Sequence, residues 1–412
     1  MRLPLILALP FLIINALIDW YICRAVSRRC RHGRRFWKPF ALWSSVLLAA
    51  GFILIICWPK KGAGDTGLEW LMWMLYIYSS IYLSKIIFII FDLIGKIPQL
   101  WHKKRIPGSL AAAGVLSTAT FIMMLWGIFN ARNIDIRQIE YRNPALPAAF
   151  DGFRIAQISD LHTGTYGTDT TFVSALVDSV NALCPDVIVF TGDIVNRHTS
   201  EIEPFVPVLA RLNAPQGVYS VLGNHDYGDY YHWASQADKD ANQQLLNSTE
   251  RAMGWQLLNN ESRTLRAGGD SIVIIGVENI GDFPFPRYGD LDKAYPGDLE
   301  NPVFKILLSH NPAHWTEDIA QSPDKNIALT LAGHTHAMQF ALGRVSPAPL
   351  RYKTWGGMYT DPDGAHDLYV NIGAGEVAIP ARIGATPEVT LFTLRKGEKT
   401  PGYARVYQPT DE

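Results

Sequence analysis

Residues 327–336 read IALTLAGHTH, an apolar run that ends in a glycine and two histidines one residue apart. A short β-rich apolar run predicts a buried strand, and the polar residues after it fall in the loop beyond the strand. Four other stretches have the same form: FRIAQISDLH at 153–162, PDVIVFTGD at 185–193, QGVYSVLGNHD at 216–226 and VFKILLSHNP at 303–312. We therefore expect polar side chains to collect at one edge of a sheet.

Helical and further strand-like segments lie between these runs. Residues 168–184 carry apolar side chains at steps of three and four, which predicts a helix between the first two strands. SIVIIG at 271–276, LYVNIG at 368–373 and EVTLFTL at 388–394 predict more strands. The alternation indicates an α/β fold for this part of the chain.

The N-terminal part has a membrane pattern. Four apolar stretches, at about 3–22, 40–58, 70–94 and 108–129, each reach the roughly 20 residues that cross a hydrocarbon core. We expect a four-helix transmembrane region over residues 1–145 and a soluble domain over 146–412. A cleaved signal peptide is the alternative for the first stretch. A retained helix is favoured because the run is long, has no small-residue cleavage site and precedes a basic segment.

Loop charge predicts the orientation of this region. Most Lys and Arg residues of this N-terminal region lie in the loops after the first and third stretches. The positive-inside rule therefore places these two loops in the cytoplasm. Both termini then lie outside, with the soluble domain on the outer, periplasmic or extracellular face of the cytoplasmic membrane. Lys85 and Asp92 share one face of the third span. Interfacial snorkelling of Lys85 is favoured over an intramembrane ion pair between the two.

Net charge divides the chain and limits its partners. Residues 1–149 hold 18 Lys and Arg against 6 Asp and Glu, and the remaining residues hold 19 against 32. Membrane lipid is the expected partner of the first part. The acidic second part is a poor partner for nucleic acid, whose backbone is bound through Lys and Arg, so no nucleic acid is expected. The four cysteines have no disulfide or zinc-site spacing.

The polar residues at the ends of the five predicted strands form one set. Taken singly, each has a structural explanation, as a turn residue, a helix cap or a satisfied histidine. All five groups falling at strand ends, in order, instead indicates a common site. The set comprises Asp160, His162, Asp193, Asn224, His225, Asp226, His310, His334 and His336.

The donor types point to metal. Carboxylate, amide and imidazole groups without a thiolate suit two divalent first-row cations better than a structural zinc site. On extended backbone, residues two apart point the same way, so each D-x-H or H-x-H pair could face one metal centre. Gly333 would let the backbone come close to that centre.

These motifs resemble those of the calcineurin-like metallophosphoesterase superfamily. The match rests on SDLH, GD, GNHD, SHNP and GHTH, over about residues 153–395. The PEVTLFTL tail and the four-helix front resemble the membrane-anchored bacterial branch, which includes enzymes acting on UDP-2,3-diacylglucosamine. The resemblance implies an αββα sandwich, two mixed sheets flanked by helices.

The resemblance also implies a set of roles. Asp160, His162 and His336 would hold one metal, Asn224, His310 and His334 the other, and Asp193 would bridge both. The two divalent ions would be Mn, Fe, Zn or similar. His225 would contact the phosphoryl oxygen or protonate the leaving group, and Asp226 would bond its ring and fix the tautomer.

Other residues stand near the motifs. Gln339 matches a recurrent family position, while Ala337 and Met338 replace two glycines that are usual in the branch. Five loop residues either border the site, where they could bind a phosphate or a lipid head group, or are ordinary loop residues. They are Arg351, Tyr352, Trp355, Tyr359 and Arg382.

The function expected from these features is hydrolysis. A membrane-anchored, dinuclear metal-dependent phosphoesterase would cleave a phosphomonoester or phosphodiester, soluble or lipid-linked, by in-line attack of a metal-bridging hydroxide. One alternative is a pyrophosphate hydrolase acting on a nucleotide-linked lipid precursor of the UDP-2,3-diacylglucosamine type. Such precursors are made inside the cell, which conflicts with the predicted orientation. A non-catalytic membrane sensor that keeps the fold is the other alternative.

Overall fold

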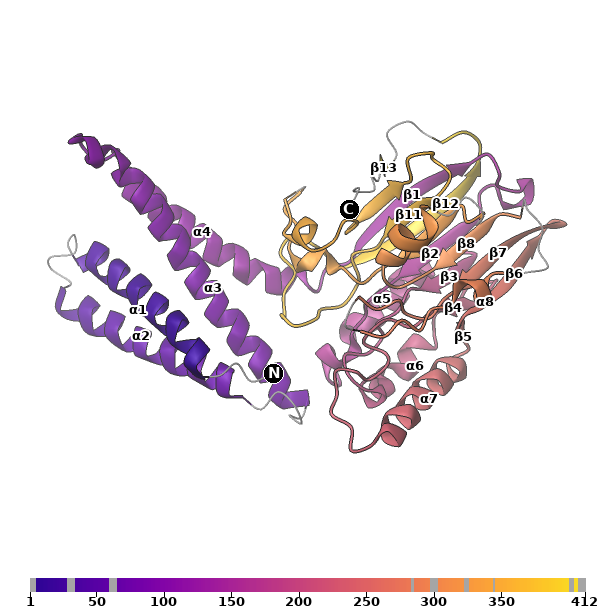
Figure 1. Ribbon diagram of the computed structural model, residues 1–412, viewed down its shortest axis with the longest axis horizontal. Helices are drawn as coiled ribbons and strands as arrows, with labels where there is room; N and C mark the ends of the chain where they lie inside the picture. The colour runs from indigo at the N-terminus through magenta and orange to yellow at the C-terminus, as the bar shows by residue number, and fades with distance from the viewer. Residues whose placement is uncertain are drawn as a thin grey trace. The chain divides into compact units, whose positions relative to one another are not determined.

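The computed structural model describes residues 5–27, 34–58, 65–282, 285–296, 303–321, 326–343, 345–399 and 404–406 (Figure 1). It comprises two compact units, which are considered separately. The first unit is Met1–Phe129 with Ala378–Ala381, and the second is Asn130–Val377 with Arg382–Glu412. The loop residues 28–33 and 59–64, which contribute to the orientation prediction, lie outside the described residues.

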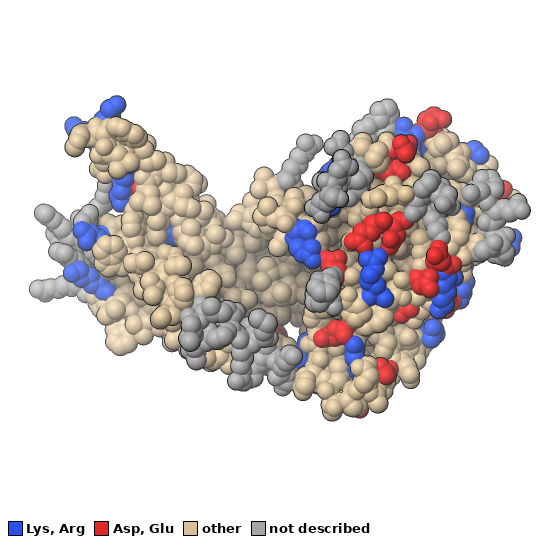
Figure 2. Space-filling view, in the orientation of Figure 1, with Lys and Arg blue, Asp and Glu red and all other residues tan. Residues whose placement is uncertain are grey.

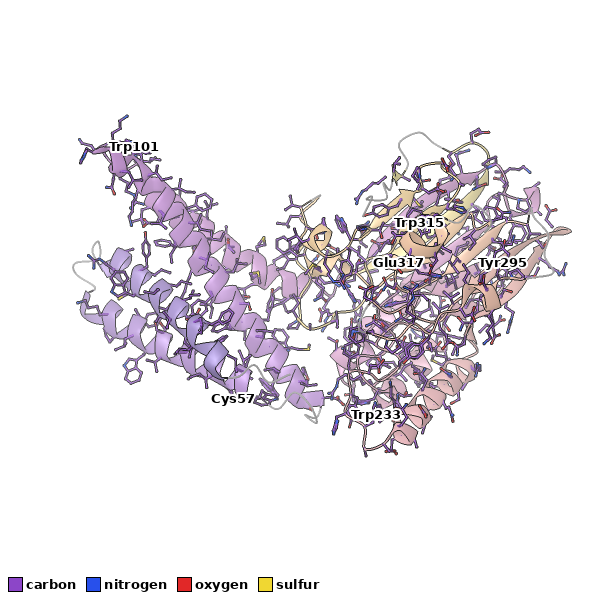
Figure 3. The ribbon with its side chains drawn as sticks, viewed as in Figure 1. Cys57, Trp101, Trp233, Tyr295, Trp315 and Glu317 are labelled. Carbon is purple, nitrogen blue, oxygen red and sulfur yellow. The ribbon has the colours of Figure 1, made fainter. Side chains whose placement is uncertain are left out.

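The first unit contains four long helices. They are α1 (Leu5–Ser27), α2 (Arg34–Cys57), α3 (Asp65–Lys96) and α4 (Ser109–Asn130). Among the described residues, three segments are long and apolar enough to cross a membrane: Lys38–Cys57, Asp65–Trp101 and Ser109–Asn130. Charged side chains are sparse on the visible surface of these helices (Figure 2). Trp101, 66% exposed, lies at the end of the short helix η1 (Ile97–Trp101), where an amphipathic ring suits a membrane interface (Figure 3).

Lys85 and Asp92 of the third helix do not pair with each other. Lys85 Nζ lies 2.5 Å from Asp19 Oδ1 of α1. Asp92, which is buried, lies 2.5 Å from Lys96 Nζ and 2.7 Å from Arg105 Nη2. The alternative of a Lys85–Asp92 pair is thus wrong, because each residue has other partners, and the snorkelling of Lys85 stays a prediction.

The second unit contains two mixed β-sheets. The strands of the first sheet, in spatial order, are β1 (Asp135–Asn143), β12 (Glu388–Lys396), β2 (Arg154–Ile158), β3 (Val187–Phe190), β4 (Val218–Ser220) and β5 (Gln256–Leu257). Those of the second are β13 (Arg405–Val406), β10 (Gly357–Thr360), β11 (Asp367–Val370), β9 (Leu329–Ala332), β8 (Lys305–Leu308), β7 (Asp270–Gly276) and β6 (Glu261–Ala267). The strands β2 to β5 are parallel, as are β7, β8, β9 and β11.

Three apolar cores define the layers. One core joins the facing sides of the two sheets, with Ile155 and Val189 from the first packed among Ile274 and Leu308 from the second. A second core packs the other side of the first sheet under α5 (Thr171–Ala182) and α7 (Gln236–Ala252). The third covers the outer side of the second sheet, where α8 (Leu291–Ala294) and η5 (Trp315–Ile319) lie. The predicted αββα sandwich is confirmed; the short α6 (Val206–Leu209) follows β3.

Strand direction places the motifs. The carboxyl ends of β2, β3 and β4 meet at one edge of the first sheet, and those of β8 and β9 meet at one edge of the second. Each of the five motifs follows closely after one of these strands. The strand β1 was not predicted; it pairs with β12 along nine residues and forms the edge of the first sheet.

Candidate metal centre

The five carboxylate and imidazole residues after β2, β3 and β9 lie in turns. Asp160, His162, Asp193, His334 and His336 all have positive φ, between 50° and 73°. The prediction that the D-x-H and H-x-H pairs stand on extended backbone is wrong, because the chain has already left the strand. Left-handed backbone is costly for residues other than glycine and often marks a functional site.

The first cluster contains four side chains. Asp160, His162, Asp193 and His336 each direct one donor atom to a common point, with these atoms within 4.8 Å of one another. His162 Nε2 lies 3.1 Å from His336 Nε2, which lies 3.2 Å from Asp160 Oδ1. All four residues are buried.

The second cluster lies beside the first. Asp193, His310 and His334 place donor atoms within 4.8 Å of one another. His310 Nε2 lies 3.2 Å from His334 Nδ1 and 3.2 Å from Asn224 Oδ1. Tyr230 Oη accepts a hydrogen bond from Asn224 Nδ2, which leaves the amide oxygen directed at the cluster.

Asp193 joins the two clusters through one oxygen. Its Oδ2 lies 3.2 Å from His310 Nε2 and 3.6 Å from His162 Nε2, one imidazole from each cluster. Its Oδ1 accepts a hydrogen bond from the backbone N–H of His225 at 2.8 Å. The structure thus brings all seven predicted ligands together around the predicted bridging carboxylate.

The donor spacing fits metal ions. Two ligands on one cation at about 2.1 Å are separated by roughly 3.0 to 3.4 Å for ordinary coordination angles. The nitrogen and oxygen contacts at 3.1 and 3.2 Å in both clusters agree with that separation. Without a cation, several lone pairs of the buried imidazoles and carboxylates would face each other and repel. A cation between them removes this repulsion.

The titration of the cluster reflects burial and its mixed charges. Burial alone would lower the pKa of His310, but Asp193 beside Nε2 raises it to about 9. Burial, with His310 nearby, lowers the pKa of His334 to about 4. Burial alone would raise the pKa of Asp193, but His310 and His225 hold it well below its usual value. Asp193 is therefore a carboxylate, as a cation ligand must be.

Asp226 has a different partner from the one predicted. Its two oxygens accept hydrogen bonds from the backbone N–H groups of Asp193, Ile194, Val195 and Gly223 at 2.8 to 3.2 Å. The ring of His225 instead lies with Nδ1 2.7 Å from the carbonyl oxygen of Asn196. The prediction that Asp226 fixes the His225 tautomer is wrong, because backbone N–H groups, most of them in the loop after β3, take both carboxylate oxygens.

Arg382 is not a surface loop residue. It is fully buried, and its guanidinium donates to the carbonyl oxygens of Ile372, Gly375 and Ala385. Its Nη2 also lies 3.0 Å from His336 Nδ1. Arg382 therefore ties the loop after β11 to a predicted metal ligand and cannot reach a substrate from solvent.

Of the other four residues predicted to border the site, two line a cavity there and two do not. Arg351 and Tyr352 line a cavity of 190 Å³ that also contains Asn224, His334, Tyr230 and Phe285. Tyr359 is buried on β10, and Thr335 Oγ1 donates to the backbone carbonyl of Trp355. The aromatic walls contributed by Tyr230 and Phe285 were not predicted, since neither residue belongs to a motif.

Two glycines let the ligands approach the backbone. A Cβ on Gly333 would lie 2.2 Å from Asp160 Oδ2, and one on Gly223 would lie 2.1 Å from Asp193 Oδ1. Both distances are far below van der Waals contact. The expectation for Gly333 is confirmed, and the glycine of GNHD has the same role.

The backbone after the second histidine of GHTH also has positive φ. The φ angles of Ala337, Met338 and Gln339 are 49°, 51° and 55°. Glycine would adopt this conformation without the Cβ penalty. Gln339 compensates by exchanging two side-chain hydrogen bonds of 2.9 Å with the backbone of Val377.

Comparisons with known proteins agree with this centre. The family model described as "Calcineurin-like phosphoesterase" matches residues 153–338. The metallophosphoesterase YkuE of Bacillus subtilis (strain 168) is 31% identical over 297 residues, which cover 70% of this chain and 92% of that protein. The chain belongs to the calcineurin-like phosphoesterase family. Members of this family are metal-dependent hydrolases, so the phosphoesterase is an enzyme with the predicted class of activity.

The N-terminal unit has relatives as well. The family model "Probable Calcineurin-like phosphoesterase, transmembrane domain" matches residues 1–132 of the phosphoesterase. The "Transmembrane protein with metallophosphoesterase domain" of Danio rerio is 29% identical over 350 residues, covering 81% of this chain and 75% of that protein. The "UDP-2,3-diacylglucosamine pyrophosphatase LpxG" of Chlamydia trachomatis is 29% identical over 337 residues, covering 69% and 97%. The four-helix membrane region is thus confirmed.

Proposed function

We propose that this phosphoesterase hydrolyses a phosphomonoester or phosphodiester with two divalent cations held by the two clusters. The observation that carries the proposal is the position of Asp193 Oδ2 between one imidazole of each cluster. Asp160, His162 and His336 would complete one cation site, and Asn224, His310 and His334 the other. The bound pair would supply a nucleophilic hydroxide near neutral pH and stabilise the entering and leaving oxygens.

Residues next to the clusters orient His225 toward the position of a substrate. Because Asn196 provides a carbonyl acceptor, the Nδ1 of His225 carries a proton and its Nε2 is the ring atom left for a substrate. The Tyr230 ring stacks on that imidazole, with centroids 4.1 Å apart and planes 13° from parallel. His225, thus oriented, would bond a phosphoryl oxygen or protonate the leaving group.

Asp226 supports this arrangement without touching the substrate. By binding four backbone N–H groups it fixes the loop that carries Asp193 to the loop that carries Asn224 and His225. We assign it a positioning role in place of the predicted catalytic one. Pre-ordered ligands and a pre-ordered His225 reduce the reorganisation that catalysis requires.

Two versions of this function differ in the side of the membrane on which the domain lies and in the bond that is cleaved. Loop charge favours the outer face, and a hydrolase there would act on esters outside the cytoplasm. LpxG is named a pyrophosphatase of a nucleotide-linked lipid, and its similarity favours a phosphoanhydride substrate as the second candidate. That activity would require the domain to lie on the cytoplasmic face.

Right-side-out membrane vesicles that carry the full chain test both points. We expect added nitrophenyl phosphate esters to be hydrolysed without permeabilisation, activity to fall at least about 100-fold after chelation, and Mn²⁺ to restore it. Turnover that appears only after permeabilisation would contradict the outer location and leave the hydrolase proposal intact. Full activity in protein shown to be metal-free would overturn the proposed mechanism.

A further inference from the structure

The segment that follows His336 exposes large apolar side chains. Met338 is 46% exposed, Leu342 43%, Val345 68% and Leu350 92%. Burying one such side chain is worth on the order of a tenfold change in an equilibrium. These four residues, named here the apolar rim, all lie shortly after a predicted metal ligand in the sequence. Four such residues fall between positions 338 and 350, and contiguous apolar surface in a folded domain marks an interaction site.

The apolar rim is held outward by ordered structure. Leu342 and Val345 exchange two backbone hydrogen bonds of 2.9 and 3.1 Å. Ser346 Oγ donates to the carbonyl oxygen of Ala337 at 3.2 Å, and Ala348 is fully buried. The backbone is therefore fixed within the domain while the apolar side chains remain exposed.

Hydrogen bonds within the second unit connect the rim segment to Asn130, the first residue of that unit. The backbone of Ala341 donates to the carbonyl oxygen of Ile383 at 2.9 Å. The preceding carbonyl oxygen, that of Arg382, accepts from Asn130 Nδ2 at 2.9 Å. Asn130 is the last residue of α4, one of the segments apolar enough to cross a membrane. The rim segment is thus linked, through residues 382 and 383, to the residue that ends this span in the sequence.

Charge around the rim also suits a bilayer surface. Residues 150–412 contain 32 acidic side chains, yet residues 325–360 contain none and include four Lys and Arg. An anionic leaflet repels carboxylates and attracts basic side chains. The rim segment therefore carries no carboxylate of its own, and Arg351 at its end pairs with Asp282.

We propose that the apolar rim inserts into the bilayer surface and that the adjacent metal centre takes phosphate esters presented there by lipid-anchored substrates. Insertion explains why large apolar side chains are exposed in the segment that follows a predicted metal ligand. The substrate half of this proposal rests on the proposed function, whereas insertion itself does not.

Depth measurement tests insertion without catalysis. The full chain, with a nitroxide attached through Val345→Cys or Leu350→Cys and the native cysteines replaced, is reconstituted in vesicles of phosphatidylethanolamine and phosphatidylglycerol. We expect both labels to be more accessible to O₂ than to a water-soluble nickel complex. Leu245→Cys on α7, where Leu245 is 51% exposed, is the matched control and should report water. Aqueous accessibility at 345 and 350, or shielding from both reagents as in a protein contact, would overturn the proposal.

Two nitrophenyl diesters test the substrate half. Hexadecyl nitrophenyl phosphate partitions into the vesicles, whereas methyl nitrophenyl phosphate stays in water. We expect Val345→Asp with Leu350→Asp to reduce turnover of the hexadecyl ester on the order of tenfold or more and to leave the methyl ester unchanged. Equal loss on both esters would contradict lipid presentation. If the unaltered enzyme hydrolyses neither these diesters nor the monoester nitrophenyl phosphate, the proposed function is refuted while the depth result stands.

Discussion

Replacing Asp193 with alanine is expected to reduce hydrolysis of nitrophenyl phosphate esters by at least about 10³-fold. One oxygen of this carboxylate lies within 3.6 Å of an imidazole of each cluster, so its loss would weaken both proposed cation sites. Removing even one electrostatic contributor from an active site commonly costs about 10²–10³ in kcat, and Asp193 would serve two cations in the proposed centre. Steady-state kinetics with excess Mn²⁺ measures the effect.

Asp178→Ala is the control for Asp193→Ala. Asp178 is 66% exposed on α5 and pairs with Arg211, so its loss should leave kcat within about a factor of two. An Asp193→Ala enzyme that is folded, binds Mn²⁺ and retains more than about a tenth of the activity would show that the carboxylate does not bridge the two sites.

Asp226→Asn is expected to lower the free energy of unfolding of the phosphoesterase domain by about 2 to 5 kcal/mol. The carboxylate is buried and accepts four backbone N–H bonds, two on each oxygen. Asparagine keeps one of these oxygens and turns an NH₂ group toward the other two donors. Each buried donor left unsatisfied costs about 1–3 kcal/mol. Thermal unfolding followed by near-UV circular dichroism should show a midpoint roughly 5–15 °C lower.

The same substitution at a surface carboxylate provides the comparison. Asp178→Asn removes the charge from an exposed ion pair and should change stability by less than about 0.5 kcal/mol. If Asp226→Asn unfolds at the temperature of the unaltered protein, the four N–H contacts do not hold the two loops together.

Much of the fold could be predicted from the sequence because its strands are uniform in composition. The buried parallel strands are continuous apolar runs that end in motif residues, and both features are visible in a single sequence. The strand β1 was missed because an edge strand has little reason to be apolar. Its first four residues are exposed, and its pairing with β12 depends on a partner that is distant in the sequence.

The candidate site was predicted as a set of donors but not as a network. Residue type and order indicated the set of donors at the strand ends, and the family resemblance implied which seven are ligands. The partners of Asp226 and Arg382, in contrast, depend on where carbonyl and N–H groups point in turns. A signal for Arg382 was present, since it stands in the mostly apolar stretch VAIPARIGATP at 377–387. A lone cation among apolar residues is more often buried and hydrogen-bonded than free to bind a ligand.

The number of cations bound per chain tests the central claim most directly. Elemental analysis of the purified full-length protein, loaded with Mn²⁺ and freed of excess metal, should give two ions per chain. Replacing His310 and His334 together with alanine should reduce the count to one, as should replacing His162 and His336. A count of one or none in the unaltered protein, or a count that neither double replacement changes, would contradict a two-cation centre built around Asp193.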